Sequence, residues 1–262
     1  MDHKEAGQYW NENAEAWTII ARAGFDIYRD YLNTPAFFEI LPDILGLHGI
    51  DIGCGEGYNT RLLAQKGAMI KAIDISEIFI QKAIQEEINN PLNIDYQVAS
   101  AVALPFEDKQ FDFATAFMCF MDIPETEQVL QEAFRVLKPN GFLQFSITHP
   151  CFDTPRRKSL RNFLGKIYAV EAGDYFENTN GKIDEWIFSA APLHLRKNLR
   201  KFRTPKFTRT LTQWINALVG TGFLIEQVNE PRPDDETIRQ QPGLQGCQVV
   251  AYFLHIRCRK PA

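Results

Sequence analysis

Short apolar runs alternate with stretches of helical periodicity between about residues 48 and 148. The apolar runs have the length of single buried strands and occupy residues 48–52, 69–73, 94–98, 111–117 and 142–148. The helical stretches lie between them, at residues 57–65, 76–88 and 125–137. Strands and helices that alternate at this spacing are typical of crossover connections. The pattern therefore predicts an α/β fold with a doubly wound, Rossmann-like and mostly parallel sheet.

Three further segments flank this alternation and complete a single predicted domain over residues 1–262. Residues 1–44 carry a helical pattern and predict an N-terminal helical cap, which precedes the cofactor-binding core at 45–150. Residues 151–210 lose the alternation and are interpreted as an insertion after the fifth strand. The pattern then resumes, with a helix at 211–219 and strands at 223–229 and 247–258. The complete sheet is therefore predicted to have seven strands.

Charge is distributed unevenly along the chain. The net charge is −5, yet residues 151–210 hold 13 Lys and Arg against six Asp and Glu. The molecule as a whole is not expected to bind nucleic acid through its charge. The basic insertion, in contrast, could act as a lid for an anionic ligand or contact phosphate groups of RNA. A solvated surface on a cap is the alternative interpretation.

Five cysteines lie far apart, at positions 54, 119, 151, 247 and 258. Their odd number and the lack of a Cys-x-x-Cys pair argue against a disulfide framework and against a metal site. The first residues are polar and no apolar run reaches the roughly 18 to 20 residues that a membrane span needs. The sequence therefore predicts a soluble, cytoplasmic protein.

The sequence IDIGCGEG at residues 50–57 follows the first predicted strand and opens the first predicted helix. Glycines let the backbone turn sharply and let a ligand approach where a Cβ would collide, and the helix that follows presents free N–H groups. The Gly-x-Gly-x-Gly spacing differs from that of dinucleotide-binding folds, which disfavours a nicotinamide dehydrogenase. Asp51, two positions before Gly53, suits a ligand with an amino group better than one with a pyrophosphate.

Asp74 ends the second predicted strand, 21 residues after Gly53. A carboxylate at this position can accept hydrogen bonds from both hydroxyls of a ribose, and it repels a 2′-phosphate. Ile75 would then supply an apolar surface for an adenine ring. The alternative interpretation of Asp74 is an acid that favours the start of the helix near Ser76.

Together these motifs resemble the class I S-adenosylmethionine-dependent methyltransferases. The resemblance rests on DIGCGEG at 51–57, AIDIS at 72–76, LPF at 104–106, FD at 111–112 and RVLKPNG at 135–141. It covers residues 48–148 and, more loosely, 211–229. It implies that the cofactor is S-adenosylmethionine.

The resemblance also implies roles for individual residues in cofactor binding. The methionine part would be held by Asp51 and by the backbone of Gly53, Cys54 and Gly55, and the ribose by Asp74.

The adenine ring would lie between Ile75 and Val102. Family members commonly carry an acidic residue before Ala101 for the adenine amino group, whereas this chain has Ser100 there, which leaves a backbone N–H at Ala101 as a further contact. Met118, in the stretch after the fourth strand, would line the pocket near the sulfonium.

His149, Tyr9 and Arg29 are candidates outside these motifs. His149 follows the fifth strand, at the rim where such sheets bind ligands, and is the candidate catalytic base or acceptor contact. The alternative is a histidine that only turns the chain into Pro150. Tyr9 would offer an aromatic face to a cationic sulfonium, and Arg29 would bind a carboxylate. Core packing of the cap is the alternative for its aromatic residues.

These observations favour an enzyme that transfers a methyl group from S-adenosylmethionine to an unidentified small-molecule acceptor. The absence of an obvious catalytic group does not argue against it, because the sulfonium methyl is already activated and positioning supplies much of the rate. The alternatives are an RNA (tRNA) methyltransferase and a protein that binds S-adenosylmethionine without methyl transfer. A monomer or homodimer without a membrane partner is expected.

Overall fold

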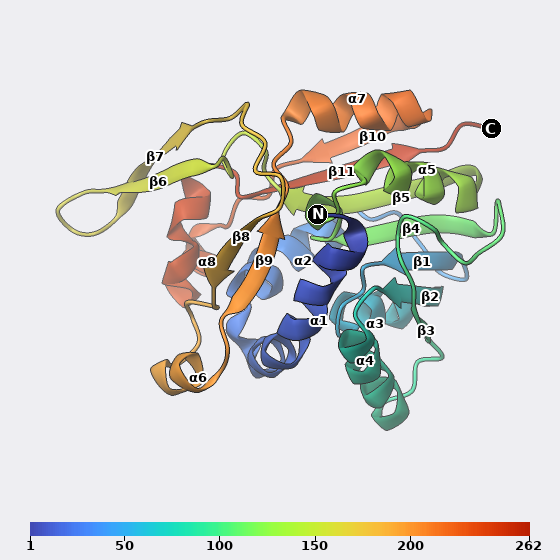
Figure 1. The fold of residues 1–262 in the computed structure, drawn as a ribbon, viewed down its shortest axis with the longest axis horizontal. Coiled ribbons are helices and arrows are strands. Elements are labelled where there is room, and N and C mark those ends of the chain that lie inside the picture. Colours follow the sequence, from blue (N-terminus) through green and yellow to red (C-terminus); the bar gives the residue numbers. More distant parts are fainter.

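A computed structural model describes residues 1–262 and contains one central sheet of seven strands (Figure 1). The strand order is β10-β11-β5-β4-β1-β2-β3. The strands are β1 (His48–Ile52), β2 (Met69–Asp74), β3 (Asp95–Val98), β4 (Phe111–Phe117), β5 (Leu137–Thr148), β10 (Leu224–Asn229) and β11 (Phe253–Arg259). Each of the first five overlaps the apolar run that predicted it. The predicted α/β class and the seven-stranded sheet are confirmed.

The sheet is parallel except at one strand. The β1–β2, β1–β4, β2–β3 and β4–β5 pairs are parallel, whereas β11 runs antiparallel to both β5 and β10. β11 begins later than the predicted strand at 247–258, because the chain is still helical there: α8 (Asp235–Gln240) is followed by a 3₁₀-helix at Pro242–Gln248, with Pro242 in its first turn.

Helices cover both faces of the sheet and form two separate cores. One face packs on α5 (Thr126–Val136) and α7 (Leu211–Thr221), and the other on α3 (Tyr58–Gln65) and α4 (Glu77–Asn89). Alternation along β4 shows the division, since Phe113 belongs to the α3–α4 core and the next residue, Ala114, to the α5–α7 core. Because helices cover both faces of the sheet, a ligand can reach the strands only at their ends, and in such sheets it binds at the carboxyl ends.

The N-terminal segment is helical, as predicted, but is broken into several pieces. They are α1 (His3–Ile20), two π-helical turns at Ala21–Phe25 and Arg29–Asn33, and α2 (Thr34–Glu39). A capping box starts α1: the Asp2 carboxylate accepts from the Glu5 N–H, and the Glu5 carboxylate accepts from the Asp2 N–H. The break falls at Gly24, whose φ of +81° a right-handed helix cannot contain.

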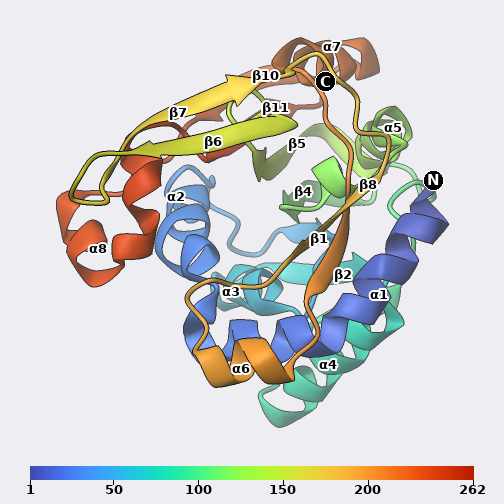
Figure 2. The same cartoon turned by 60° about the vertical axis from the view of Figure 1, so that its left-hand side comes forward.

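The insertion between β5 and α7 forms strands that the sequence pattern did not predict. β6 (Arg156–Arg161) and β7 (Ile167–Gly173) make one antiparallel hairpin, and β8 (Lys182–Trp186) pairs with β9 (Phe202–Lys206) around α6 (Leu193–Asn198). β9 packs against α1, and the β6–β7 hairpin projects from the body of the molecule (Figures 1 and 2). None of the helices combines the length and the apolar character needed to cross a membrane.

Candidate functional site

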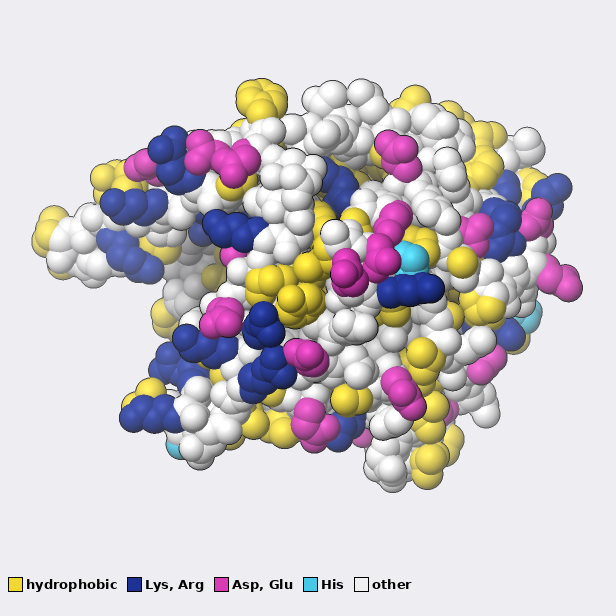
Figure 3. Space-filling view, in the orientation of Figure 1, with side chains coloured by type: hydrophobic (Ala, Val, Ile, Leu, Met, Phe, Trp, Pro, Cys, Tyr) yellow, Lys and Arg dark blue, Asp and Glu magenta, His cyan; other side chains and the backbone are white.

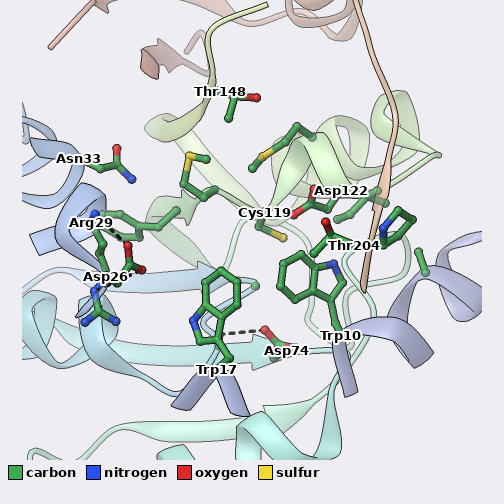
Figure 4. A pocket seen from close by; sticks show the side chains of 18 of the residues that line it. Trp10, Trp17, Asp26, Arg29, Asn33, Asp74, Cys119, Asp122, Thr148 and Thr204 are labelled. Atoms are coloured by element: carbon green, nitrogen blue, oxygen red, sulfur yellow. Dashed lines mark hydrogen bonds and ion pairs between the residues drawn. The ribbon is translucent and has the colours of Figure 1, made fainter. Parts of the chain in front are cut away.

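A cavity of about 760 Å³ lies where the carboxyl ends of the parallel strands meet α1 and the β8–β9 pair. The glycine loop after β1, Asp74 at the end of β2, residues 99–101 and residues 117–119 after β4 line the sheet side. In Figure 4, Trp10 and Trp17 rise from α1 into the cavity. Ten of the 13 predicted site residues line this cavity: Arg29, Asp51, Gly53, Cys54, Gly55, Asp74, Ile75, Ser100, Ala101 and Met118.

The loop between β1 and α3 owes its shape to glycines. Gly53 has a φ of +72°, and a Cβ built on it would stand 2.2 Å from the Cys119 sulfur. Gly55 has a φ of +56°, and nothing lies within 4 Å of the position of its Cβ. The first glycine is therefore needed for close packing of two loops, whereas the second leaves open space for a ligand.

Asp74 ties the β2 end to this loop. One oxygen of its carboxylate accepts from the Gly55 N–H at 2.9 Å and the other from the Ser76 N–H at 2.8 Å. Burial raises the pKa of Asp74 to about 6, against the effect of these hydrogen bonds. Each oxygen keeps a second lone pair that can accept a hydroxyl.

Asp51 is buried deeper, between β1, α3 and β4. Its carboxylate accepts from the Thr60 hydroxyl at 2.6 Å and from the Thr115 hydroxyl at 2.8 Å. Burial raises its pKa to about 6 as well. The two carboxylates place negative charge on the sheet side of the cavity.

The segment after β3 agrees with the predicted positions in part. Ser100 and Ala101 line the cavity, but Val102 does not and is only 5% exposed within the α5–α7 core. The Val102 N–H donates to the Ser100 hydroxyl oxygen at 3.4 Å, so the turn points the valine inward. This position gives no support to the prediction that Val102 covers an adenine ring, which stays a prediction.

The residues after β4 adopt a strained turn. Met118 has a φ of +52° although it is not a glycine, and its N–H donates to the Ser146 carbonyl at 3.0 Å. This turn directs Met118 and Cys119 to the cavity. Burial raises the pKa of the Cys54 and Cys119 thiols well above the usual value, so both are neutral and are not nucleophiles.

Arg29 lines the cavity from within a cluster of carboxylates. Its guanidinium lies 2.7 Å from Asp30, 3.2 Å from Glu56 and 4.0 Å from Asp26. It also stacks at 3.9 Å over the ring of Tyr58. Much of its charge is therefore neutralised within the chain, and its predicted contact with a cofactor carboxylate stays a prediction.

Tyr9 and His149 lie outside the cavity lining. The Tyr9 ring packs under Arg203, 5.0 Å from the guanidinium, on the outer side of α1. His149 is 3% exposed, its Nδ1 accepts from the Cys151 N–H, and its Nε2 lies 2.7 Å from the Glu230 carboxylate. Both ring nitrogens are thus engaged in holding the turn after β5. The structure does not support the prediction of a catalytic base at His149 or of a cofactor contact at Tyr9.

The roof of the cavity joins α1 to the insertion through aromatic packing. The Trp17 ring lies 5.5 Å from Trp186, 4.8 Å from Phe188 and 4.9 Å from Phe202, between ring centroids. Trp10 meets Trp17 edge-to-face at 5.5 Å. Trp10, Trp17, Trp186 and Phe188 also line the cavity, so this cluster is both a packed core and a wall.

Several charged residues on this side were not predicted as site residues; besides Asp184 and Glu185 on β8, four lie near the ends of β4, β5 and β9. These four are Asp122, Asp153, Lys206 and Arg209. Asp153 and Lys206 pair at 2.9 Å, and the Arg209 guanidinium donates to the Ile123 and Pro124 carbonyls. The Asp122 carboxylate, which follows β4 in a 3₁₀ turn, has neither a hydrogen-bond nor an ion-pair partner in the chain.

The charge of the lining fits the cofactor that the sequence motifs imply. Eight carboxylates line the cavity against one lysine and two arginines. S-adenosylmethionine carries a cationic sulfonium, which such a wall attracts. The cofactor is an amino acid joined to a nucleoside. The open space at Gly55 can admit its amino-acid part, and the free lone pairs of Asp74 can accept its ribose hydroxyls.

Comparisons with known proteins agree with this geometry. Residues 50–145 match the family described as a methyltransferase domain. Ubiquinone biosynthesis O-methyltransferase of Coxiella burnetii is 29% identical over 133 residues, which are 51% of this chain and 52% of that protein. The enzyme of the same name from Pseudomonas fluorescens is 31% identical over 134 residues, 51% of this chain and 53% of the relative. The chain thus spans about half the length of the curated relatives it matches.

A solved structure extends the likeness over nearly the whole chain. The S-adenosylmethionine-dependent methyltransferase from Mesorhizobium loti superposes with a TM-score of 0.69 and 26% identity, over 86% of this chain and 96% of the other. The glycine loop, Asp74 and the sheet order occur together with this agreement in sequence and fold. The chain therefore belongs to the class I S-adenosylmethionine-dependent methyltransferases.

Proposed function

We propose that this protein methylates a small aromatic acceptor at a hydroxyl oxygen. The observation that carries the proposal is one cavity, here called the chamber, in which the glycine loop and Asp74 face aromatic walls and a free carboxylate. Its volume of about 760 Å³ falls within the range of roughly 300–1,000 Å³ typical of small-molecule sites. The names of the O-methyltransferase relatives agree with an oxygen acceptor.

The sheet side of the chamber would hold the cofactor. Asp74 would accept the ribose hydroxyls, and the backbone at Gly53 and Gly55 would hold the amino-acid part. Ile75 and the segment at Ser100 and Ala101 would contact the adenine. When bound, the cofactor supplies an activated methyl group for displacement by a nucleophile.

The roof would hold the acceptor. Trp10, Trp17 and Trp186 give flat apolar surfaces on which an aromatic ring can stack. α1 and the β8–β9 pair line this side of the cavity, and an acceptor bound there would displace water, which strengthens electrostatic interactions inside.

Asp122 would serve as the base. A phenol with a pKa near 10 is protonated at neutral pH, so transfer to its oxygen requires that a proton leave. Burial and the neighbouring Asp153 carboxylate raise the pKa of Asp122 well above the usual value for an aspartate, which makes it a stronger base. The Arg209 and Lys206 cations near Asp122 act in the opposite direction and limit this rise of its pKa.

An RNA acceptor is less well supported. Of the basic residues in the insertion, Arg196, Arg200 and Arg203 lie outside the cavity lining. Arg200 pairs with Glu12 at 2.7 Å and Arg203 with Glu185 at 3.7 Å, so part of the positive charge is neutralised. The acidic cavity would in addition repel phosphates.

Two measurements test the proposal. Calorimetric titration should show binding of S-adenosylmethionine and S-adenosylhomocysteine but not of NAD. Asp74→Ala should weaken that binding by roughly 2 to 4 kcal/mol, because two ribose hydroxyls lose a charged acceptor. Asp95→Ala, on the exposed edge strand β3, is the matched control and should bind normally.

A methyl-release assay then identifies the acceptor class. Its arms are catechols and phenols, primary amines, thiols and total RNA, each with wild type and Asp74→Ala. Turnover confined to the phenolic arm supports the proposal. Turnover confined to RNA, or unchanged turnover in Asp74→Ala, would contradict it.

A further inference from the structure

The β6–β7 hairpin carries an apolar tip that no other part of the chain covers. It projects away from the sheet (Figures 1 and 2), and its turn exposes 95% of Phe163 and 76% of Leu164. In Figure 3 apolar side chains mark the end of this projection, with basic side chains beside them. Two large neighbouring apolar residues exposed at a protruding tip indicate an interaction site.

The turn holds these two side chains outward by its own hydrogen bonds. The Asn162 side-chain oxygen accepts from the Leu164 and Lys166 N–H groups at 3.0 Å each. The Asn162 N–H in turn donates to the Lys166 carbonyl at 2.9 Å. The tip is therefore a formed turn that presents Phe163 and Leu164.

The hairpin is fixed to the body directly behind the turn, at Ile167, the first residue of β7. The Gln245 side chain accepts from the Ile167 N–H at 2.8 Å and donates to the Ile167 carbonyl at 2.9 Å. The 3₁₀-helix before β11 thus supports the hairpin just behind the exposed Phe163 and Leu164.

Basic side chains lie along the hairpin, and Arg161 and Lys166 flank its tip. Five lie on the hairpin: Arg156, Arg157, Lys158, Arg161 and Lys166. Only Glu171 on the hairpin and Asp174 at its base oppose them, and Asp174 pairs with Arg156 at 3.6 Å. Lys158, Arg161 and Lys166 have no carboxylate within ion-pair distance, although a chain of net charge −5 offers many.

We propose that this hairpin docks the protein on an anionic lipid surface. Phe163 and Leu164 enter the boundary between headgroups and acyl chains, and Lys158, Arg161 and Lys166 contact the lipid phosphates. Apolar side chains flanked by cations are the combination that binds such interfaces. A convex tip buries too little area for a stable protein–protein contact, which needs about 800 Å² on each partner. The inference is independent of the acceptor chosen above.

Sedimentation with lipid vesicles tests the proposal on the full-length protein. Wild type should sediment with phosphatidylglycerol–phosphatidylcholine vesicles and not with phosphatidylcholine alone, and 0.5 M salt should release it. Phe163→Ser/Leu164→Ser and Lys158→Glu/Lys166→Glu should each bind at least about ten-fold more weakly. The matched control, Ile88→Ser/Val219→Ser, removes two exposed apolar side chains from α4 and α7 and should bind like wild type.

Two further readouts keep the result interpretable. Thermal unfolding and S-adenosylhomocysteine affinity should be the same in all variants, which shows that each is folded. Wild type that stays in solution with anionic vesicles at low salt would overturn the proposal, as would a tip variant that sediments normally. A dimer in gel filtration that Phe163→Ser/Leu164→Ser converts to a monomer would also overturn it, because the tip would then contact a second copy.

Discussion

Asn13 on α1 exchanges two hydrogen bonds with the backbone of Arg203 on β9, 190 residues away. The Asn13 amide donates to the Arg203 carbonyl at 3.0 Å, and its oxygen accepts from the Arg203 N–H at 3.0 Å. The side chain thus takes the place of a neighbouring strand at the edge of β9 that β8 leaves free. The N-terminal cap and the insertion are thereby joined into one roof.

Asn13→Ala should loosen this roof. Two backbone groups of Arg203 would lose their partners at a site where Asn13 is 1% exposed, which costs about 1 to 3 kcal/mol. We expect a melting temperature lower by several degrees and a faster release of S-adenosylhomocysteine, measured by thermal unfolding and stopped-flow fluorescence. Asn198→Ala, an exposed asparagine on α6, is the control and should change neither quantity.

The core of the fold could be predicted because its strands are buried on both faces and read as continuous apolar runs, as in β4. The insertion could not. β6 begins Arg-Arg-Lys, with all three side chains exposed, and its register is fixed by pairing with β7 and not by a core. A strand without a buried face leaves no periodic signal.

The candidate site divides in the same way. Gly53, Gly55 and Asp74 were predictable because their roles depend on the local turn between a strand and a helix. Val102 and His149 lie next to lining residues in sequence, but tertiary packing turns their side chains into the core and toward Glu230. Asp122 could not be predicted as a site residue, because a single acidic residue after a strand is common and its role depends on residues that are distant in the sequence.

Gly53 and Gly55 should respond differently to alanine. Gly53→Ala would place a Cβ on a backbone with a left-handed φ and against the Cys119 sulfur, and the protein should lose about 2 to 5 kcal/mol of folding stability. In Gly55→Ala only the left-handed φ is unfavourable, and the protein should lose about 1 to 2 kcal/mol of folding stability. The added methyl group would nevertheless project into the cavity and weaken cofactor binding. Urea unfolding and calorimetry separate the two effects; wild-type cofactor affinity in Gly55→Ala would show that no ligand approaches this loop.

Arg29→Met should destabilise the protein even without a ligand. Asp26, which is 7% exposed, would lose its cation, and Glu56, which is 6% exposed, would keep only Arg22; breaking a buried pair costs about 3 to 5 kcal/mol. Arg239→Met breaks an exposed pair with Glu236 and should cost less than about 1 kcal/mol. Arg29→Met should bind 5′-methylthioadenosine, which lacks the carboxylate, as wild type does. A selective loss of S-adenosylhomocysteine binding would show that Arg29 also contacts the cofactor carboxylate.

Cofactor affinity should fall with pH below about 6. Burial raises the pKa of Asp74 to about 6, and only its ionised form accepts two hydroxyls. As the pH drops through that value the carboxyl takes up a proton, and binding one unit lower should be roughly ten-fold weaker. Calorimetry with S-adenosylhomocysteine between pH 5 and 8 measures this. Asp74→Asn should bind weakly throughout with a shallower profile, to which Asp51, also raised to about 6, still contributes. Equal wild-type affinity at pH 5 and 7.5 would contradict the role of Asp74.

Asp122→Asn should reduce kcat by roughly 100-fold or more while cofactor affinity stays within two-fold, because a base acts on the acceptor and not on the cofactor. The wild-type rate should rise with pH through the raised pKa of Asp122, and the variant should lose this rise. Asp153→Asn is the control, since that carboxylate lines the same cavity but is held by Lys206, and its kcat should fall far less.

Acceptors of different acidity separate a role of Asp122 as a base from a structural role. A nitrocatechol is largely ionised at neutral pH and needs no base, so it should recover most of the lost rate in Asp122→Asn, whereas an unsubstituted phenol should not. An equal loss of rate for both acceptors would mean that Asp122 supports the shape of the chamber and removes no proton.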